Sequence, residues 1–169
     1  MKSARIIMTE HCTRQCDYCC NRLPDVRIAF QFVPDLAAIP LENYREICIS
    51  GGEPLLYPQS VDKVIQWAGN RKIYLYTNGD LILSRRSWLT RWKESLSGLN
   101  ISLHDGHTSL ALEQIQKSLG IPLRVHVQDC KVTNSIIYAT EPPNLSLKIW
   151  VAGQCVVKDE DRYILTKLP

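Results

Sequence analysis

Residues 12–20 read Cys-Thr-Arg-Gln-Cys-Asp-Tyr-Cys-Cys, and the rest of the chain is organised around them. Four of the protein's seven cysteines fall within this stretch. A packed core gives no reason to concentrate thiols in this way, whereas a metal centre does, because thiolates are metal ligands. The stretch therefore predicts a metal site near the amino terminus.

The bulk composition indicates an ordinary globular domain. The 169 residues suffice to bury a core without disulfide staples, and 45% hydrophobic with 22% charged residues exclude a fibrous or disordered chain. The net charge of +3 is compatible with an anionic ligand but does not by itself predict a nucleic-acid partner. We expect one domain over residues 1–169, with a core at about 4–152 and a tail at 153–169.

The first residues are not expected to form a membrane or export signal. Ile6, Ile7 and Met8 form an apolar run that is too short for a signal peptide or a membrane span. We therefore expect a cytoplasmic protein with no membrane partner. Thiols stay reduced in the cytoplasm, where clustered cysteines indicate metal binding or catalysis more often than disulfides.

Short apolar runs alternate with segments of helical spacing. The runs predict strands at residues 5–9, 46–50, 72–77, 99–103, 123–128 and 144–151. The spacing predicts helices at residues 59–68, 84–96 and 108–119, with a short helix at 34–38 or 41–45. Residues 21–34 are expected to be irregular, and residues 155–168 to form a tail or small hairpin.

Strands that alternate with helices predict right-handed βαβ crossovers and a parallel sheet. Six such units are two short of a closed eight-unit barrel. The predicted fold class is therefore α/β, an open and partial (β/α)6 barrel.

Polar and apolar residues alternate along the last three predicted strands. The polar positions are Asn100, Ser102, His104, Arg124, His126, Gln128, Ser146, Lys148 and Trp150. The apolar positions must face the helices, so we expect the polar ones to line a lumen. The alternative is an ordinary sheet whose polar face meets solvent.

Cys12, Cys16 and Cys19 are the candidate metal ligands. Gaps of three and two residues between thiolates suit a tetrahedral zinc site or an iron–sulfur cluster. Zinc commonly takes its four ligands as two separated pairs, whereas here three cysteines share one loop. A cluster held by three cysteines leaves its fourth iron open to a substrate or cofactor.

The spacing Cys12-x3-Cys16-x2-Cys19, with Tyr18 before the last cysteine, resembles the signature of the radical SAM superfamily. Three later elements resemble the family's motifs in the same order: Gly51-Gly52-Glu53-Pro54, Tyr76-Thr77-Asn78-Gly79 and Ile101-Ser102-Leu103-His104-Asp105. The resemblance covers roughly residues 4–152. It implies a partial β/α barrel that holds a [4Fe-4S] cluster and S-adenosylmethionine (SAM).

The resemblance also implies an activity. The reduced cluster would cleave SAM to methionine and a 5′-deoxyadenosyl radical, which abstracts a hydrogen atom from a substrate. Such an enzyme needs a one-electron donor of the flavodoxin or ferredoxin type. The cofactors carry the difficult chemistry, while the protein orients them and excludes water.

By this resemblance, six residues are cofactor-binding candidates: Tyr18, Gly51, Gly52, Glu53, Asn78 and Ser102. The two glycines would let backbone carbonyls approach the methionine ammonium, since no Cβ intervenes. Glu53 is expected to be structural within the turn. Ser102 would contact the methionine carboxylate or ribose with Asn78 nearby, and Tyr18 would pack near adenine.

Arg124, His126 and Lys148 are the candidate substrate-binding residues. Two cations on neighbouring inward faces would suit a carboxylate or phosphate. Internal pairing is the alternative for Arg124 and Lys148, and an ordinary satisfied polar role is the alternative for His126.

The other cysteines have less defined roles. We expect Cys20 to be a bystander and Cys48 to be a small core or lumen residue. Cys130 and Cys155 could serve a second cluster, but they are isolated in the sequence. The tail has no cysteine-rich extension, and residues 123–128 lack the glycine pattern common in the family's fifth strand.

The substrate stays open, as a small molecule or a protein. Activases of glycyl-radical enzymes, such as anaerobic ribonucleotide reductase, predict a large protein partner. The 7-carboxy-7-deazaguanine synthases predict a small anionic substrate. A non-enzymatic alternative is a structural zinc or iron–sulfur module, for which Cys20 or His11 would supply the fourth ligand.

Overall fold

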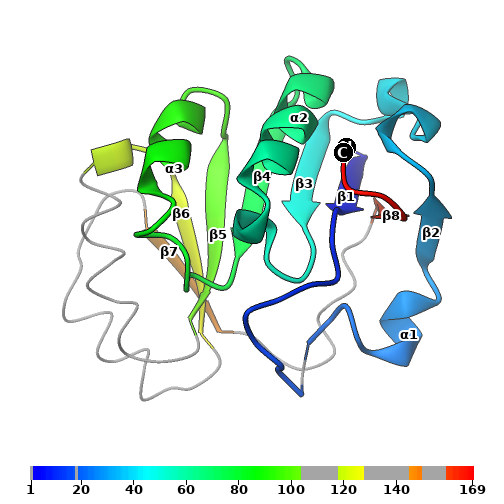
Figure 1. Ribbon diagram of the computed structural model, residues 1–169, viewed down its shortest axis with the longest axis horizontal. Coiled ribbons are helices and arrows are strands. Elements are labelled where there is room, and N and C mark those ends of the chain that lie inside the picture. The colour runs from blue at the N-terminus through cyan, green and yellow to red at the C-terminus, as the bar shows by residue number, and fades with distance from the viewer. Residues whose placement is uncertain (1, 18, 104–117, 128–144, 150–158) are drawn as a thin grey trace.

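The computed structural model describes residues 2–17, 19–103, 118–127, 145–149 and 159–169 (Figure 1). The described strands form one eight-stranded sheet in the order β2-β8-β1-β3-β4-β5-β6-β7. Every neighbouring pair is parallel. The outer strands β2 and β7 do not pair with each other, so the described sheet is open. This α/β architecture is consistent with a partial barrel.

All six predicted strands are confirmed, with shifts of one or two residues at their ends. They are β1 (Ser3–Ile7), β3 (Glu46–Ser50), β4 (Lys72–Thr77), β5 (Gly98–Leu103), β6 (Leu123–Val127) and β7 (Leu145–Ile149). Their apolar runs give both the hydrophobic content and the length that a buried parallel strand needs.

Two further strands were not predicted. β2 (Phe30–Val33) lies in the segment expected to be irregular, and β8 (Glu160–Leu165) lies in the expected hairpin. β8 is parallel to both of its neighbours, β1 and β2, so the hairpin is wrong for residues 160–165. The hairpin was expected around Asp159-Glu160-Asp161, whereas Glu160 and Asp161 belong to the strand and form ion pairs with Arg162 and Lys2.

The described helices are short. They are α1 (Pro24–Arg27), α2 (Pro58–Ala68) and α3 (Arg86–Trp92), with 3-10 turns at Leu36–Ala38, Leu41–Asn43 and Pro54–Leu56. α2 confirms its prediction, and α3 is shorter than expected because turns replace its first and last residues. The helix predicted at 108–119 lies outside the described residues, apart from helical Ser118 and Leu119.

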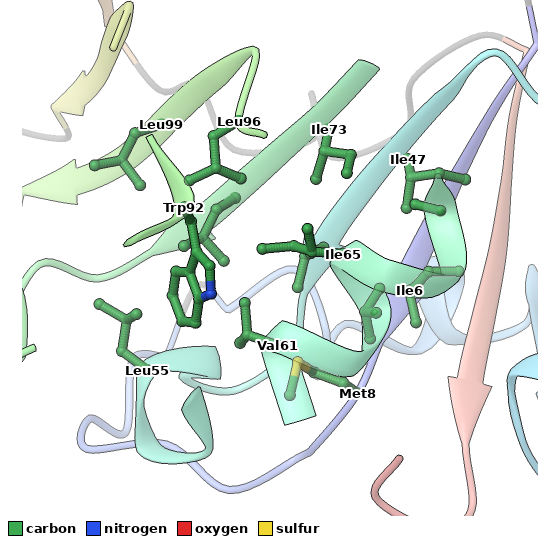
Figure 2. Close-up of a cluster of buried hydrophobic side chains, with 14 of the residues drawn as sticks. Ile6, Met8, Ile47, Leu55, Val61, Ile65, Ile73, Trp92, Leu96 and Leu99 are labelled. Atoms are coloured by element: carbon green, nitrogen blue, oxygen red, sulfur yellow. The ribbon is translucent and has the colours of Figure 1, made fainter. Parts of the chain in front are cut away.

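The main core lies between one face of the sheet and helices α2 and α3 (Figure 2). Val61 and Ile65 of α2 and Trp92 of α3 pack against strand residues such as Ile47 and Leu99. The indole Nε1 of Trp92 also donates to Asp62 at 2.9 Å, which joins α3 to α2. This packing holds α2 and α3 against one face of the sheet.

The opposite face carries polar side chains, which the alternation had predicted for the last three of the six expected strands. Arg5 donates two hydrogen bonds to Glu160, at 2.8 and 3.0 Å, and its guanidinium lies 4.2 Å from the ring centroid of Tyr76. Arg162 bonds the same carboxylate at 3.1 Å. Asn100 and Arg162 are only 3% and 4% exposed. At these strands the polar face is therefore buried, as a lumen would be.

The carboxyl ends of β1, β3 and β4 meet at one edge, and the chain leaving β1 crosses that edge (Figure 1). In parallel sheets, ligands bind at this edge. Within the described ranges, none of the helices combines the length and apolar character that a membrane span needs.

Candidate active site

The cysteine loop begins just after β1, where Met8 N donates to Ser50 O at 3.1 Å. Cys12, Cys16 and Cys19 are partly buried, and none of them forms a disulfide. Cys16 and Cys19 are joined by a turn, in which Cys19 N donates to Cys16 O at 3.2 Å. Among the described residues, no three His, Cys, Asp or Glu side chains gather as tightly as a single metal ion requires.

Hydrogen-bond donors converge on the first cysteine. The Arg14 backbone N–H lies 3.4 Å from Cys12 Sγ, and Asn78 Nδ2 lies 3.5 Å from the same atom. Two N–H groups, one from the backbone and one from a side chain, are therefore directed at the same sulfur atom. Three thiols on one loop, backed by such donors, fit the ligand chemistry of an iron–sulfur cluster.

The two glycines of the next motif are required by the cysteine loop itself. Gly51 has φ of +150°, and a Cβ there would lie 2.5 Å from Thr9 O. A Cβ on Gly52 would lie 1.9 Å from His11 O. Gly52 N and Glu53 N donate to Thr9 O and His11 O at 2.7 and 2.8 Å. The turn thus packs against the start of the loop. This contact explains why both positions are glycine, whereas the predicted reason was a close approach of the backbone to SAM.

The same turn also holds the far end of the loop. Asn21 follows the cysteine stretch directly, and its Nδ2 donates to Gly51 O at 2.6 Å. Asn21 was not among the predicted site residues. The available signal was an amide side chain placed immediately after the last cysteine of the stretch, where it could bond to a neighbouring backbone. Both ends of the cysteine loop are therefore fixed to one glycine turn.

Glu53 joins the ends of β3 and β4. Its fully buried carboxylate accepts hydrogen bonds from Leu55 N, Thr77 Oγ1 and Asn78 N at 2.8–2.9 Å. Burial raises the pKa of Glu53, and these hydrogen bonds oppose the shift only in part. The carboxylate is enclosed by protein donors, and the whole residue is 0% exposed, which supports the expected structural role of Glu53 rather than a direct contact with a cofactor.

Asn78 connects the end of β4 to the cysteine loop. Its Nδ2 donates to Thr13 Oγ1 at 2.8 Å, and the Thr13 hydroxyl donates to Asp80 at 2.9 Å. The Arg14 guanidinium bonds the same carboxylate at 2.8 Å. Thr13, Arg14 and Asp80 were not predicted as site residues, although Asp80 directly follows the Asn78-Gly79 turn.

Comparison with protein-family models now adds a second kind of evidence. The model of the radical SAM superfamily matches residues 6–122, which is more than half of the chain. The protein belongs to the radical SAM superfamily. No curated protein matches the sequence. Membership supports the radical SAM reaction class, and members of the family generally bind a [4Fe-4S] cluster and SAM.

Strand pairing places several predicted radical SAM residues in one row. Ser102 of β5 lies beside His126 of β6, which lies beside Lys148 of β7. Arg124 occupies the neighbouring row beside Asn100, and its side chain is exposed. Ser102 and His126 are partly buried. The register thus brings the substrate candidates together, although the side chain of Lys148 is outside the described part.

Other predicted positions fall outside the described residues. They are Tyr18, His104, Gln128, Trp150, Cys130 and Cys155.

The two candidates for a fourth protein ligand differ in what the structure shows of them. Cys20 is disulfide-bonded and so does not act as a thiolate ligand. His11 has its Nδ1 2.5 Å from the hydroxyl of Tyr57. Cys48 is buried on β3, as expected, and burial raises the pKa of its thiol to about 11 against the opposing effect of Arg5. The three cysteines of the motif are free and partly buried, whereas Cys20 is disulfide-bonded and Cys48 is buried.

Proposed function

We propose that this protein is a radical SAM enzyme whose Cys12, Cys16 and Cys19 hold a [4Fe-4S] cluster. When bound and reduced, the cluster supplies the electron that splits SAM into methionine and a 5′-deoxyadenosyl radical, which takes a hydrogen atom from the substrate. The observation that carries the proposal is the set of three thiols on a single loop at the carboxyl edge of the sheet.

The chain's own residues would hold this loop in place. The glycine turn fixes the loop at Thr9, His11 and Asn21, and Asp80 fixes it at Thr13 and Arg14. A loop fixed at both ends keeps its ligands near their final positions, so less ordering is needed when the cofactor binds.

SAM would bind beside the loop at the carboxyl ends of β3 and β5. The backbone of the glycine turn is one candidate contact, with Gly52 O as the candidate partner for the methionine ammonium, since Gly51 O already accepts from Asn21. Ser102 is the candidate for the methionine carboxylate or ribose. Tyr18 remains the candidate neighbour of adenine.

The substrate we propose is a small anion. Ser102, His126 and Lys148 share one row of the sheet, and Arg124 is exposed in the next row. Cations and hydrogen-bond donors on adjacent strands suit a carboxylate or phosphate. A flavodoxin- or ferredoxin-type protein would supply the electron.

Cofactor content tests the proposal. After anaerobic reconstitution, the wild-type protein should hold about four irons per chain, as this cluster type requires. Cys12→Ala, Cys16→Ala and Cys19→Ala should each lose most of that iron. Cys48→Ala is the matched control, because Cys48 is a buried thiol on β3 and should leave the iron content unchanged. One zinc per chain and no iron would contradict the proposal.

A further inference from the structure

The side-chain amide of Asn78 is fixed in one orientation. Its Oδ1 accepts a hydrogen bond from Asp80 N at 3.0 Å, so its Nδ2 must point the other way. The two amide hydrogens then have two acceptors, Thr13 Oγ1 at 2.8 Å and Cys12 Sγ at 3.5 Å. Asn78 is only 7% exposed, so little water competes for these bonds.

The backbone of Asn78 is held as firmly as its side chain. Asn78 N donates to the buried carboxylate of Glu53 at 2.8 Å. On the other side, the Thr13 hydroxyl donates a hydrogen bond to Asp80, which also accepts one from Arg14. Thr13 Oγ1 is therefore an acceptor toward Asn78, and the direction of each bond in the network follows. The amide is a pre-oriented donor to the sulfur of Cys12.

We propose that Asn78 is a positioning residue that tunes the cluster by donating to the Cys12 thiolate. Hydrogen bonds to ligating sulfur atoms are among the factors that set the potential of an iron–sulfur cluster. Such a donor stabilises the more negative, reduced state, so it raises the potential. The inference rests on the proposed function, because Cys12 must be a cluster ligand. It assigns Asn78 to the cluster rather than to SAM.

The experiment is a redox titration of the reconstituted protein without SAM, followed by electron paramagnetic resonance. Asn78→Ala and Asn78→Leu both remove the donor, and leucine keeps the branched shape of the side chain. Both variants should hold as much iron as the wild type, and both midpoint potentials should shift to more negative values.

Thr13→Val is the matched control. It keeps the shape of the side chain and the charge of the loop, removes the other acceptor of the amide and leaves the bond from Asn78 to Cys12 available. Its potential should shift less than that of Asn78→Ala.

Each other outcome overturns the inference. If both Asn78 variants hold a full cluster at the wild-type potential, the tuning role is wrong and the proposed function stands. If neither variant assembles a cluster, Asn78 is an assembly residue rather than a tuning residue. If the wild type itself assembles none, the proposed function fails as well.

Discussion

The glycine at position 52 is fixed by contact with the chain's own backbone. His11 O lies where a Cβ would have to be, and that histidine immediately precedes the first cysteine of the motif. Any side chain at position 52 would displace the start of the ligand loop. The residue therefore acts on the site through the backbone of the ligand loop.

Gly52→Ala should consequently lower the free energy of unfolding by about 1–3 kcal/mol, the usual cost of overpacking, and should reduce iron incorporation. Chemical denaturation and iron analysis measure the two effects. Gly69→Ala is the control, because Gly69 has φ of +61° but open space around its Cβ position. It should cost about 1–3 kcal/mol of backbone strain and leave iron unchanged. Equal iron loss in both variants would contradict the contact with His11.

Residue roles differed in how well the sequence predicted them. The three cysteines are predicted to be ligands because their chemistry and spacing are local properties of one loop. Asn78 was assigned to SAM, whereas its amide contacts Cys12, which lies 66 positions earlier in the chain. Such a contact depends on how β4 meets the loop, and no local pattern records it.

At the scale of elements, β8 is an interior strand of the sheet, between β1 and β2. Its pairing with β1 is reinforced by the ion pair of Glu160 with Arg5, whose side chains are 2% and 13% exposed. Arg5 lies 155 positions from Glu160 in the sequence, so the local sequence does not show this pairing. Without its partner, the charged stretch around Glu160 resembles a turn. β2 (Phe30–Val33) was not predicted because it is short and is followed directly by Pro34.

Glu160→Gln should destabilise the protein by about 3–5 kcal/mol, because it leaves Arg5 buried with an uncompensated charge. Urea denaturation measures the change in the free energy of unfolding. Glu94→Gln is the control, since Glu94 is 87% exposed in its pair with Lys93 and should cost less than about 1 kcal/mol. A Glu160→Gln variant as stable as the control would show that β8 does not depend on this ion pair.

At the scale of the whole molecule, the two faces of the sheet have different roles. One face packs on α2 and α3 and forms the main core. The other buries polar groups, among them Arg5, Tyr76 and the thiol of Cys48. The alternation of polar and apolar residues predicted this division, because side chains of a strand alternate between faces. Predicting which polar groups pair with each other would have required the order of the strands, which the alternation does not give.

The buried thiol of Cys48 should make global stability depend on pH. Its pKa in the folded protein is raised to about 11 from 9.0, so the unfolded chain releases the proton first as the pH rises. The free energy of unfolding should therefore fall between about pH 9 and pH 11, by at most about 2–3 kcal/mol from this group.

Cys48→Ala should show a shallower decline over the same pH range when thermal or urea unfolding is followed. The other thiols and the tyrosines titrate in both proteins, so the difference between the two curves isolates Cys48. Parallel curves would show that the thiol of Cys48 titrates alike in the folded and unfolded chain.

The central claim is that this radical SAM protein uses the thiols of one loop to cleave SAM. The most direct measurement is the release of 5′-deoxyadenosine from SAM by the anaerobically reconstituted, dithionite-reduced protein, compared with Cys16→Ala. We predict release by the wild type and none above background by the variant. Equal release by both proteins, or no release by a wild type that holds its full cluster, would contradict the claim.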